Sequence, residues 1–214
     1  MGCDTVTGRI IRGDADVAEG AAWLAEIEPR FAKILPALSP LPLRLEPDGF
    51  GPLMHAIMGQ QVSVASANAI WDRLVAGGLT TPDAIIAVSH DDLRALGLSR
   101  QKAKYAHALA VAGIDFNGLR SKPNSDVIKV LTAVTGIGAW TAEVYVMFSL
   151  GRADVFASGD LALQEGARLI FDLPARPTAK EIAQMSERWS PWRSVAARII
   201  WAYYGATKKR DGIV

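Results

Sequence analysis

The most informative segment of this 214-residue chain reads Leu131-Thr-Ala-Val-Thr-Gly-Ile-Gly-Ala-Trp-Thr-Ala142. The run from Asp126 to Val134 places apolar residues at i, i+3, i+4 and i+7, which is one face of a helix. Residues 135–138 then interrupt that helix, because two glycines around one apolar residue suit a tight turn with positive φ. A second helix is expected from Ala139 to about Leu150. The segment therefore predicts a helix, a glycine-rich hairpin and a second helix.

Such a hairpin can bind a phosphate. Its glycines remove side chains, so that backbone N–H groups and the N-terminus of the second helix can face an anion. These contacts hold a nucleic-acid backbone without reading its sequence. The simpler interpretation is a helix C-cap followed by a packed helix, because Gly-x-Gly alone is a weak signal. The residues predicted to contact the backbone are Thr135, Gly136, Ile137, Gly138 and Thr141.

Further motifs stand in order around the hairpin. They are Ile57-Met-Gly-Gln-Gln-Val-Ser63, Leu93-Arg-Ala-Leu-Gly-Leu-Ser99, Asp154-Val-Phe-Ala-Ser-Gly-Asp160 and Trp189-Ser-Pro-Trp-Arg-Ser194. Together they resemble the helix-hairpin-helix plus Gly/Pro-Asp signature of base-excision DNA glycosylases, most of all the bacterial 3-methyladenine DNA glycosylase II branch. The resemblance runs from about residue 50 to 205. It implies a DNA repair hydrolase that flips a damaged base out of the duplex.

Composition sets modest bounds on function. Half of the residues are hydrophobic, which suffices for a real core, and the net charge of +1 does not by itself indicate a nucleic-acid binder. The basic groups at Arg100, Lys102, Lys104 and 208–210 suit a solvated face better than a DNA contact on charge alone. No apolar run is long enough to span a bilayer and no leader is apparent. Together with the resemblance, which implies a bacterial DNA repair enzyme, this leads us to expect a cytoplasmic protein that works on the nucleoid.

No cofactor is expected to be required. The single cysteine, Cys3, excludes an internal disulfide and the four-cysteine iron–sulfur cluster of some related glycosylases. His55, His90 and His107 lack the spacing of metal ligands, so a metal hydrolase is not expected. The resemblance allows a monovalent cation held by hairpin carbonyls. It also implies that the partner is double-stranded DNA containing alkylated bases, bound by a monomer.

Almost every segment has a helical pattern and none alternates like a strand, so the predicted fold class is all-α. We expect a helical run over Val17–Leu35, a helix over Phe50–Ala76 that breaks near Gly59-Gln-Gln61, and a last helix capped by Ser190-Pro191 and ended by Gly205. The family resemblance makes this a two-lobed fold, in a minimal version without the N-terminal α/β lobe of longer relatives. The expected parts are residues 1–48, packing with the C-terminal helices, 49–125 with a loop that enters DNA, and 126–214 with the hairpin and the catalytic residue.

Asp160 is the candidate catalytic residue. Cleavage of an N-glycosidic bond passes through an oxocarbenium-like sugar, which needs a fixed negative charge nearby. Asp160 matches the catalytic aspartate of the family. The alternative is that Asp160 is simply the N-cap of the helix over Leu161–Phe171. The two roles are compatible, because a helix N-terminus favours an ionised carboxylate.

Residue 140 separates two reaction types. Superfamily members with lyase activity carry a nucleophilic lysine here, whereas this chain has Trp140 and no lysine between Lys129 and Lys180. The expectation is a monofunctional hydrolase that leaves an intact strand with an abasic site. A bifunctional glycosylase/lyase is disfavoured, and a non-catalytic binding module would need the hairpin but not Asp160.

Trp140 and Trp201 match the family's pocket tryptophans. Alkylation at N3 or N7 makes a purine cationic, and an aromatic face attracts a cation by roughly 0.5–2 kcal/mol. We therefore expect 3-methyladenine and 7-methylguanine to be substrates. Core packing is the competing explanation for both tryptophans and the default for the others. Val144 and Leu161 stand where some relatives have tyrosine, so the pocket is less aromatic.

Gln60 and Gln61 lie where the family inserts a side chain into the duplex. Gln61 falls on the wedge position that fills the space left by the flipped base, and some relatives have leucine there. An amide at this position exchanges apolar stacking for hydrogen bonds to the orphaned base. Without the resemblance, both residues would be surface residues of an interrupted helix.

Overall fold

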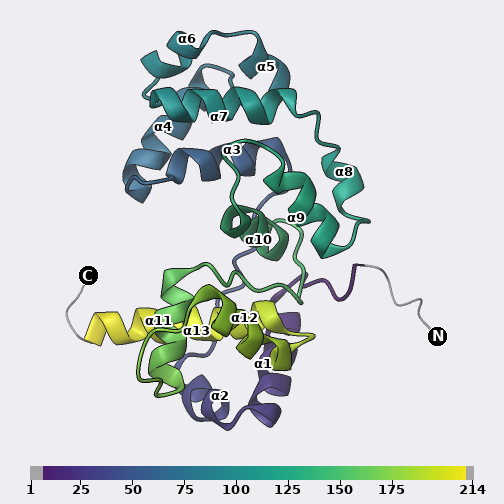
Figure 1. Ribbon diagram of the computed structural model, residues 1–214, viewed down its shortest axis with the longest axis vertical. Coiled ribbons are helices and arrows are strands. Elements are labelled where there is room, and N and C mark those ends of the chain that lie inside the picture. The colour runs from purple at the N-terminus through teal and green to yellow at the C-terminus, as the bar shows by residue number, and fades with distance from the viewer. Residues whose placement is uncertain (1–6, 211–214) are drawn as a thin grey trace. The chain divides into compact units, whose positions relative to one another are not determined.

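The computed structural model describes residues 7–210, with the side chains of all but 64, 209 and 210. Helices are the only named elements in that range, together with one isolated antiparallel bridge between Ile10 and Arg152 (Figure 1). This confirms the all-α prediction. None of the helices in this part of the chain has the length and apolar character needed to cross a bilayer. Cys3 lies outside the described residues.

The chain forms two compact units. Unit 1 combines residues 1–45 with 146–214, and unit 2 comprises residues 46–145. Unit 1 contains α1 (Asp14–Ile27), α2 (Pro29–Ile34), η1 (Leu35–Ala37), α11 (Leu161–Ile170), α12 (Ala179–Ser186), η2 (Glu187–Trp189) and α13 (Arg193–Arg210). Unit 2 contains α3 (Phe50–Gly59), α4 (Val64–Ala76), α5 (Pro82–Ile86), α6 (His90–Ala95), α7 (Arg100–Val111), α8 (Phe116–Leu119), α9 (Asn124–Thr132) and the first part of α10 (Ala139–Phe148).

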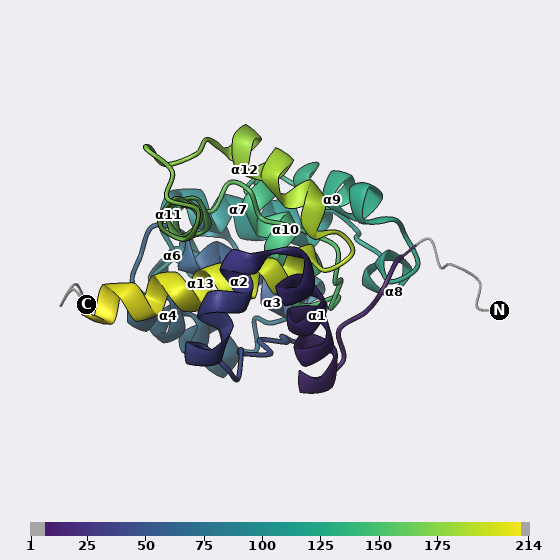
Figure 2. The ribbon, with the colours of Figure 1, turned by 90° about the horizontal axis from the view of Figure 1, so that it is seen from below.

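The core of unit 1 is built around α13. Both α11 and α1 pack against this helix, and Figure 2 shows α1 beside it. Trp189 is fully buried, with its ring centroid 5.3 Å from that of Phe31 and 5.6 Å from that of Phe156. The expected assignment of Trp189 to the core is therefore confirmed. The N-terminal helices belong to the same unit as the C-terminal ones because they share this aromatic core.

Two helix boundaries differ from the sequence-based prediction. The expected continuous helix over residues 17–35 is wrong, since α1 ends at Ile27 and α2 begins at Pro29. Proline has no N–H to continue the first helix, and Glu28 between them is extended with φ −129°. The predicted end of the last helix at Gly205 is also wrong, because α13 continues to Arg210. One exposed glycine costs a helix only about 1 kcal/mol, and the following residues are good helix formers.

The predicted helix break in unit 2 is confirmed. The break near Gly59–Gln61 separates α3 from α4. The side chains of Thr81 and Ser89 accept hydrogen bonds from the backbone N–H groups of the third residues of α5 and α6, so each is the N-cap of its helix. The hairpin after α9 belongs to unit 2, whereas the sequence-based partition grouped it with the C-terminal helices. The reason is local packing, because the hairpin lies against α7 and the end of α3.

Candidate active site and DNA-contact surface

Gly136 gives the hairpin its shape. Its φ is +100°, and a Cβ atom at this position would lie 2.3 Å from Cγ of Tyr105 on α7. Only glycine adopts this φ without strain and leaves the space that Tyr105 occupies. Gly138 does not have positive φ, so that part of the reasoning from two glycines is wrong. A Cβ at Gly138 would meet no atom within 4 Å, and the backbone there is open to an approaching molecule.

The backbone of the hairpin, rather than its side chains, is available for contacts. Ile137 is buried and anchors the turn in unit 2, whereas Thr135 and Gly138 are exposed. Thr141 is only 7 % exposed, so a contact from this predicted residue would come from its N–H. The first turn of α10 supplies N–H groups that have no partner within the helix. This arrangement matches the chemistry of an anion held by backbone donors.

The loop between α3 and α4, residues 60–63, is tied to the hairpin. The Gln60 side-chain amide donates to the Gly136 carbonyl at 2.9 Å. The ammonium of Lys102, on α7, donates to the Met58 carbonyl at 2.7 Å and fixes the end of α3. Gln61 is exposed and has φ +57°, an uncommon backbone conformation for a residue other than glycine. Of the two predicted wedge residues, Gln60 is engaged inside the unit and Gln61 faces outward.

Trp140 lies in the first turn of α10 and is 45 % exposed. Glu143 lies one helical turn further along. Burial raises the pKa of its carboxyl from 4.5 to about 7. The same helix is joined to the start of unit 2 by Tyr145, whose hydroxyl donates to Asp48 and accepts the Gly49 N–H at 3.0 Å. These contacts fix α10 and with it the orientation of Trp140.

Asp160 is the N-cap of α11, as the sequence predicted. Its Oδ1 accepts the Leu163 N–H at 2.9 Å and the indole N–H of Trp201 at 3.1 Å. The carboxylate is half-buried and stands at the positive end of a helix dipole, which favours a negative charge. The structure thus brings together two predicted site residues that are 41 positions apart in the chain.

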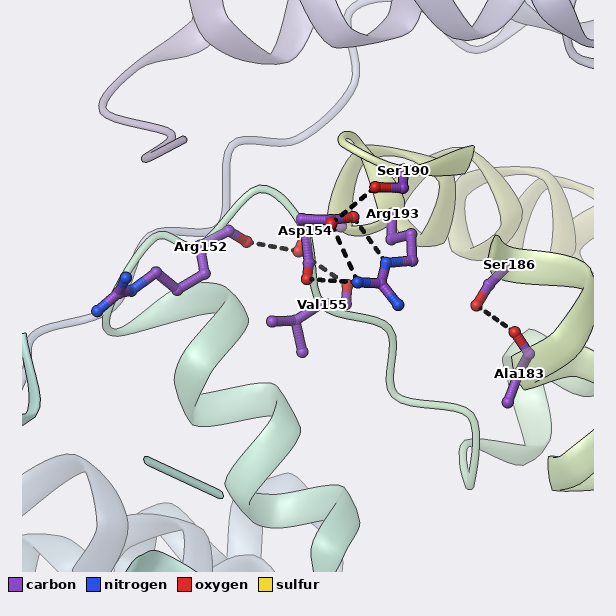
Figure 3. Close-up of polar contacts among 8 residues, drawn as sticks. Arg152, Asp154, Val155, Ala183, Ser186, Ser190 and Arg193 are labelled. Carbon is purple, nitrogen blue, oxygen red and sulfur yellow. Dashed lines mark hydrogen bonds and ion pairs between the residues drawn. The ribbon is translucent and has the colours of Figure 1, made fainter. Parts of the chain in front are cut away.

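The loop that leads to Asp160 is fixed by Asp154. Its carboxylate accepts two bonds from the Arg193 guanidinium, at 2.6 and 3.0 Å, and one from the Ser190 hydroxyl at 2.8 Å (Figure 3). The buried Ser194 hydroxyl lies 2.6 Å from the Arg152 carbonyl, on the same loop. Asp154 therefore has a structural role, because it joins the loop to the start of α13.

Trp201 is half-buried on α13. Its ring centroid lies 5.8 Å from that of Phe148, and Cζ of Arg44 lies 5.9 Å from the indole centroid. No pattern in the sequence indicated Arg44 at this site, because this residue stands in the proline-containing linker. The sequence also did not indicate the hydrogen bond from Gln60 to the hairpin or the bonds from Arg193 and Ser190 to Asp154. Each of these contacts joins residues that are far apart in the chain.

Residues 54–191 match a family model described as HhH-GPD superfamily base excision DNA repair protein. The chain is 34 % identical over 160 residues to DNA-3-methyladenine glycosylase 1 of Schizosaccharomyces pombe, covering 70 % of this chain and 69 % of that protein.

Two solved structures share the fold. The DNA-3-methyladenine glycosidase of Bacillus halodurans superimposes with a TM-score of 0.77 at 30 % identity, covering 92 % of each chain. The 3-methyladenine DNA glycosylase of S. pombe, solved in complex with abasic DNA, gives a TM-score of 0.75 at 28 % identity. It covers 89 % of this chain and 97 % of that one.

Proposed function

Because this chain belongs to the HhH-GPD superfamily of base excision DNA repair proteins, we propose that it is a DNA glycosylase that removes alkylated bases from double-stranded DNA. The observation that carries the proposal is Asp160, a carboxylate fixed by two N–H donors at a helix N-terminus. The names of its relatives support 3-methyladenine as a substrate. We include 7-methylguanine as a substrate because methylation of a ring nitrogen makes this base cationic as well.

The bond to be broken is inaccessible in a stacked duplex, so the damaged nucleotide has to leave the helix first. The bond between C1′ and the base nitrogen then breaks, and its electron pair leaves with the base. A cationic base departs as a neutral molecule and needs no proton. The sugar becomes oxocarbenium-like, and the Asp160 carboxylate stabilises that positive charge. Water adds its oxygen to C1′ and releases a proton, which leaves an abasic site.

Trp140 favours hydrolysis over strand cleavage. The lyase reaction needs an amine that forms a Schiff base with the sugar, and an indole cannot do this. The exposed indole of Trp140 is instead suited to stacking on a flipped cationic base. The proposed product is free base and an intact strand with an abasic site.

No cofactor is part of the proposed reaction. A monovalent cation at the hairpin would be held by backbone carbonyls, two of which also accept hydrogen bonds within unit 2. The Gly136 carbonyl accepts the Gln60 amide at 2.9 Å, and the Gly138 carbonyl accepts the Ala142 N–H at 3.1 Å. Each of these carbonyl oxygens keeps a second lone pair that can coordinate such an ion. The bound ion would be an accessory that adds positive charge near a phosphate. We propose that the protein acts as a monomer in the cytoplasm.

The test is release of methylated bases from DNA treated with a methylating agent, measured by chromatography. A gel of an end-labelled duplex, with and without hot alkali, then reports strand cleavage. We expect release of 3-methyladenine and a strand that breaks only after alkali. If the protein bound lesion-containing DNA but released no base, it would be a non-catalytic DNA-binding protein. A strand cut before alkali, trapped by borohydride, would establish a lyase.

A further inference from the structure

Two arginines of unit 1, Arg44 and Arg198, lie close enough to interact electrostatically. Arg198, on α13, is fully buried and donates two hydrogen bonds to the Leu43 carbonyl, at 3.2 and 2.9 Å. A third bond goes to the Ser194 carbonyl at 3.0 Å, and the guanidinium stands 4.8 Å from the Phe148 ring centroid. Burial and then the nearby charge of Arg44 lower the pKa of Arg198 to about 10.

Arg44 follows Leu43 directly and is exposed. Its φ is +51°, so a residue with a large side chain occupies the left-handed region that favours glycine. The Arg198 bonds to Leu43 hold the backbone in this position. Strained backbone of this kind is concentrated at functional sites, where the surrounding structure maintains it.

No carboxylate among the described side chains lies within salt-bridge distance of either guanidinium. The contact that Arg44 does make is with the indole of Trp201, whose N–H is bonded to Asp160. A cation–π contact at an exposed position contributes only about 0.5–1 kcal/mol. Packing alone does not explain why the charge of Arg44 lies near the buried charge of Arg198. The pair is better explained by an anion that comes from outside the protein.

We propose that Arg44 binds a backbone phosphate of the nucleotide that is delivered to Asp160. This inference rests on the proposed function. Phosphate is the anionic group of a DNA strand, and the planar guanidinium can hold two of its oxygens at once. A cationic alkylated base is repelled by the same guanidinium, so the base is not the ligand. Arg44 therefore holds the strand beside Trp201 while the sugar faces the carboxylate.

The experiment compares Arg44→Gly with wild type. Glycine suits φ +51°, so this change removes the side chain without adding backbone strain. Affinity for a duplex with an abasic-site analogue is measured at several salt concentrations, and base release is measured in single turnover at saturating enzyme. Arg44→Gln repeats the test with a longer neutral side chain. Arg12→Ala removes an exposed arginine from the same unit and serves as the control.

We expect Arg44→Gly to bind the duplex about tenfold more weakly at 0.15 M salt, with a release rate at saturation within threefold of wild type. The slope of log affinity against log salt should fall by roughly 0.9, the contribution of one phosphate. An unchanged affinity and slope in both variants would overturn the proposal. So would a slower release at saturation with an unchanged slope, because Arg44 would then act on Asp160. If wild type releases no methylated base, the proposed function fails instead.

Discussion

At the scale of the residue, Asp160 combines a structural and a chemical role. Its Oδ1 accepts both the helix N–H and the Trp201 indole N–H, and an asparagine oxygen can accept the same two bonds. Asp160→Asn should therefore fold and bind lesion-containing DNA like wild type. Base release should fall by at least about 100-fold, because only the charge is lost. Single-turnover release within about tenfold of wild type, or ~1.4 kcal/mol, would exclude Asp160 as the catalytic group.

Trp201 can be tested for its two contacts separately. Trp201→Phe keeps an aromatic ring near Phe148 but removes the N–H that Asp160 accepts. A hydrogen bond to a charged group contributes about 1.5–3 kcal/mol, so release of 3-methyladenine should slow by about tenfold or more. Trp201→Ala should slow it further. Trp23→Phe makes the same substitution elsewhere in unit 1 and serves as the control. If Trp23→Phe slowed the release of 3-methyladenine equally, the effect would be a general loss of stability and not the loss of the bond to Asp160.

Glu143 makes stability depend on pH. Its pKa is raised from 4.5 to about 7 by burial, so the folded protein holds a proton that the unfolded chain releases between these values. The free energy of unfolding should therefore fall as pH rises from about 4.5 to 7. Glu143→Gln removes this dependence. Denaturant unfolding should show the variant about 1–3 kcal/mol more stable than wild type at pH 8, with a smaller difference at pH 5. Parallel pH profiles for the two proteins would contradict the assignment.

At the scale of the element, the two hairpin glycines serve different purposes. Gly136→Ala should destabilise unit 2 by roughly 2 kcal/mol or more, since its Cβ would meet Tyr105 and its φ is +100°. Gly138→Ala has free space and should fold normally. Its methyl group would stand on the exposed backbone of the hairpin and weaken binding to every DNA sequence alike. Thermal unfolding and DNA titration together separate the two effects. Unchanged DNA affinity in folded Gly138→Ala would make the hairpin only a packed turn.

At the scale of the whole molecule, the charge of the damaged base should decide which bases the protein removes. A cationic base already has a weakened glycosidic bond, and an exposed indole attracts it by stacking. We expect 3-methyladenine to be released faster than hypoxanthine or uracil from otherwise identical duplexes. The measurement is the single-turnover rate for each base at saturating enzyme. Faster release of a neutral base would require hydrogen-bonding groups in the pocket that the sequence did not indicate.

The sequence by itself determined the helical fold class, the hairpin, the break before Gln61 and the N-cap at Asp160. These features depend on residues within one or two helical turns of each other, so periodicity, capping and glycine placement report them directly. The two boundary errors arose where local signals compete, at Pro29 and Gly205. The sequence also pointed to Trp140 and Trp201, through family resemblance.

Only the tertiary structure decided how these residues are held and which of them meet. The Trp201 indole bonds the Asp160 carboxylate, Gln60 bonds the hairpin rather than facing outward, and Arg44 stands over Trp201. Each of these contacts joins residues more than 40 positions apart. Their geometry depends on how the helices of a unit pack together, and packing is determined by the combined volumes and shapes of many buried side chains. A local pattern in the sequence does not determine how these buried side chains pack together.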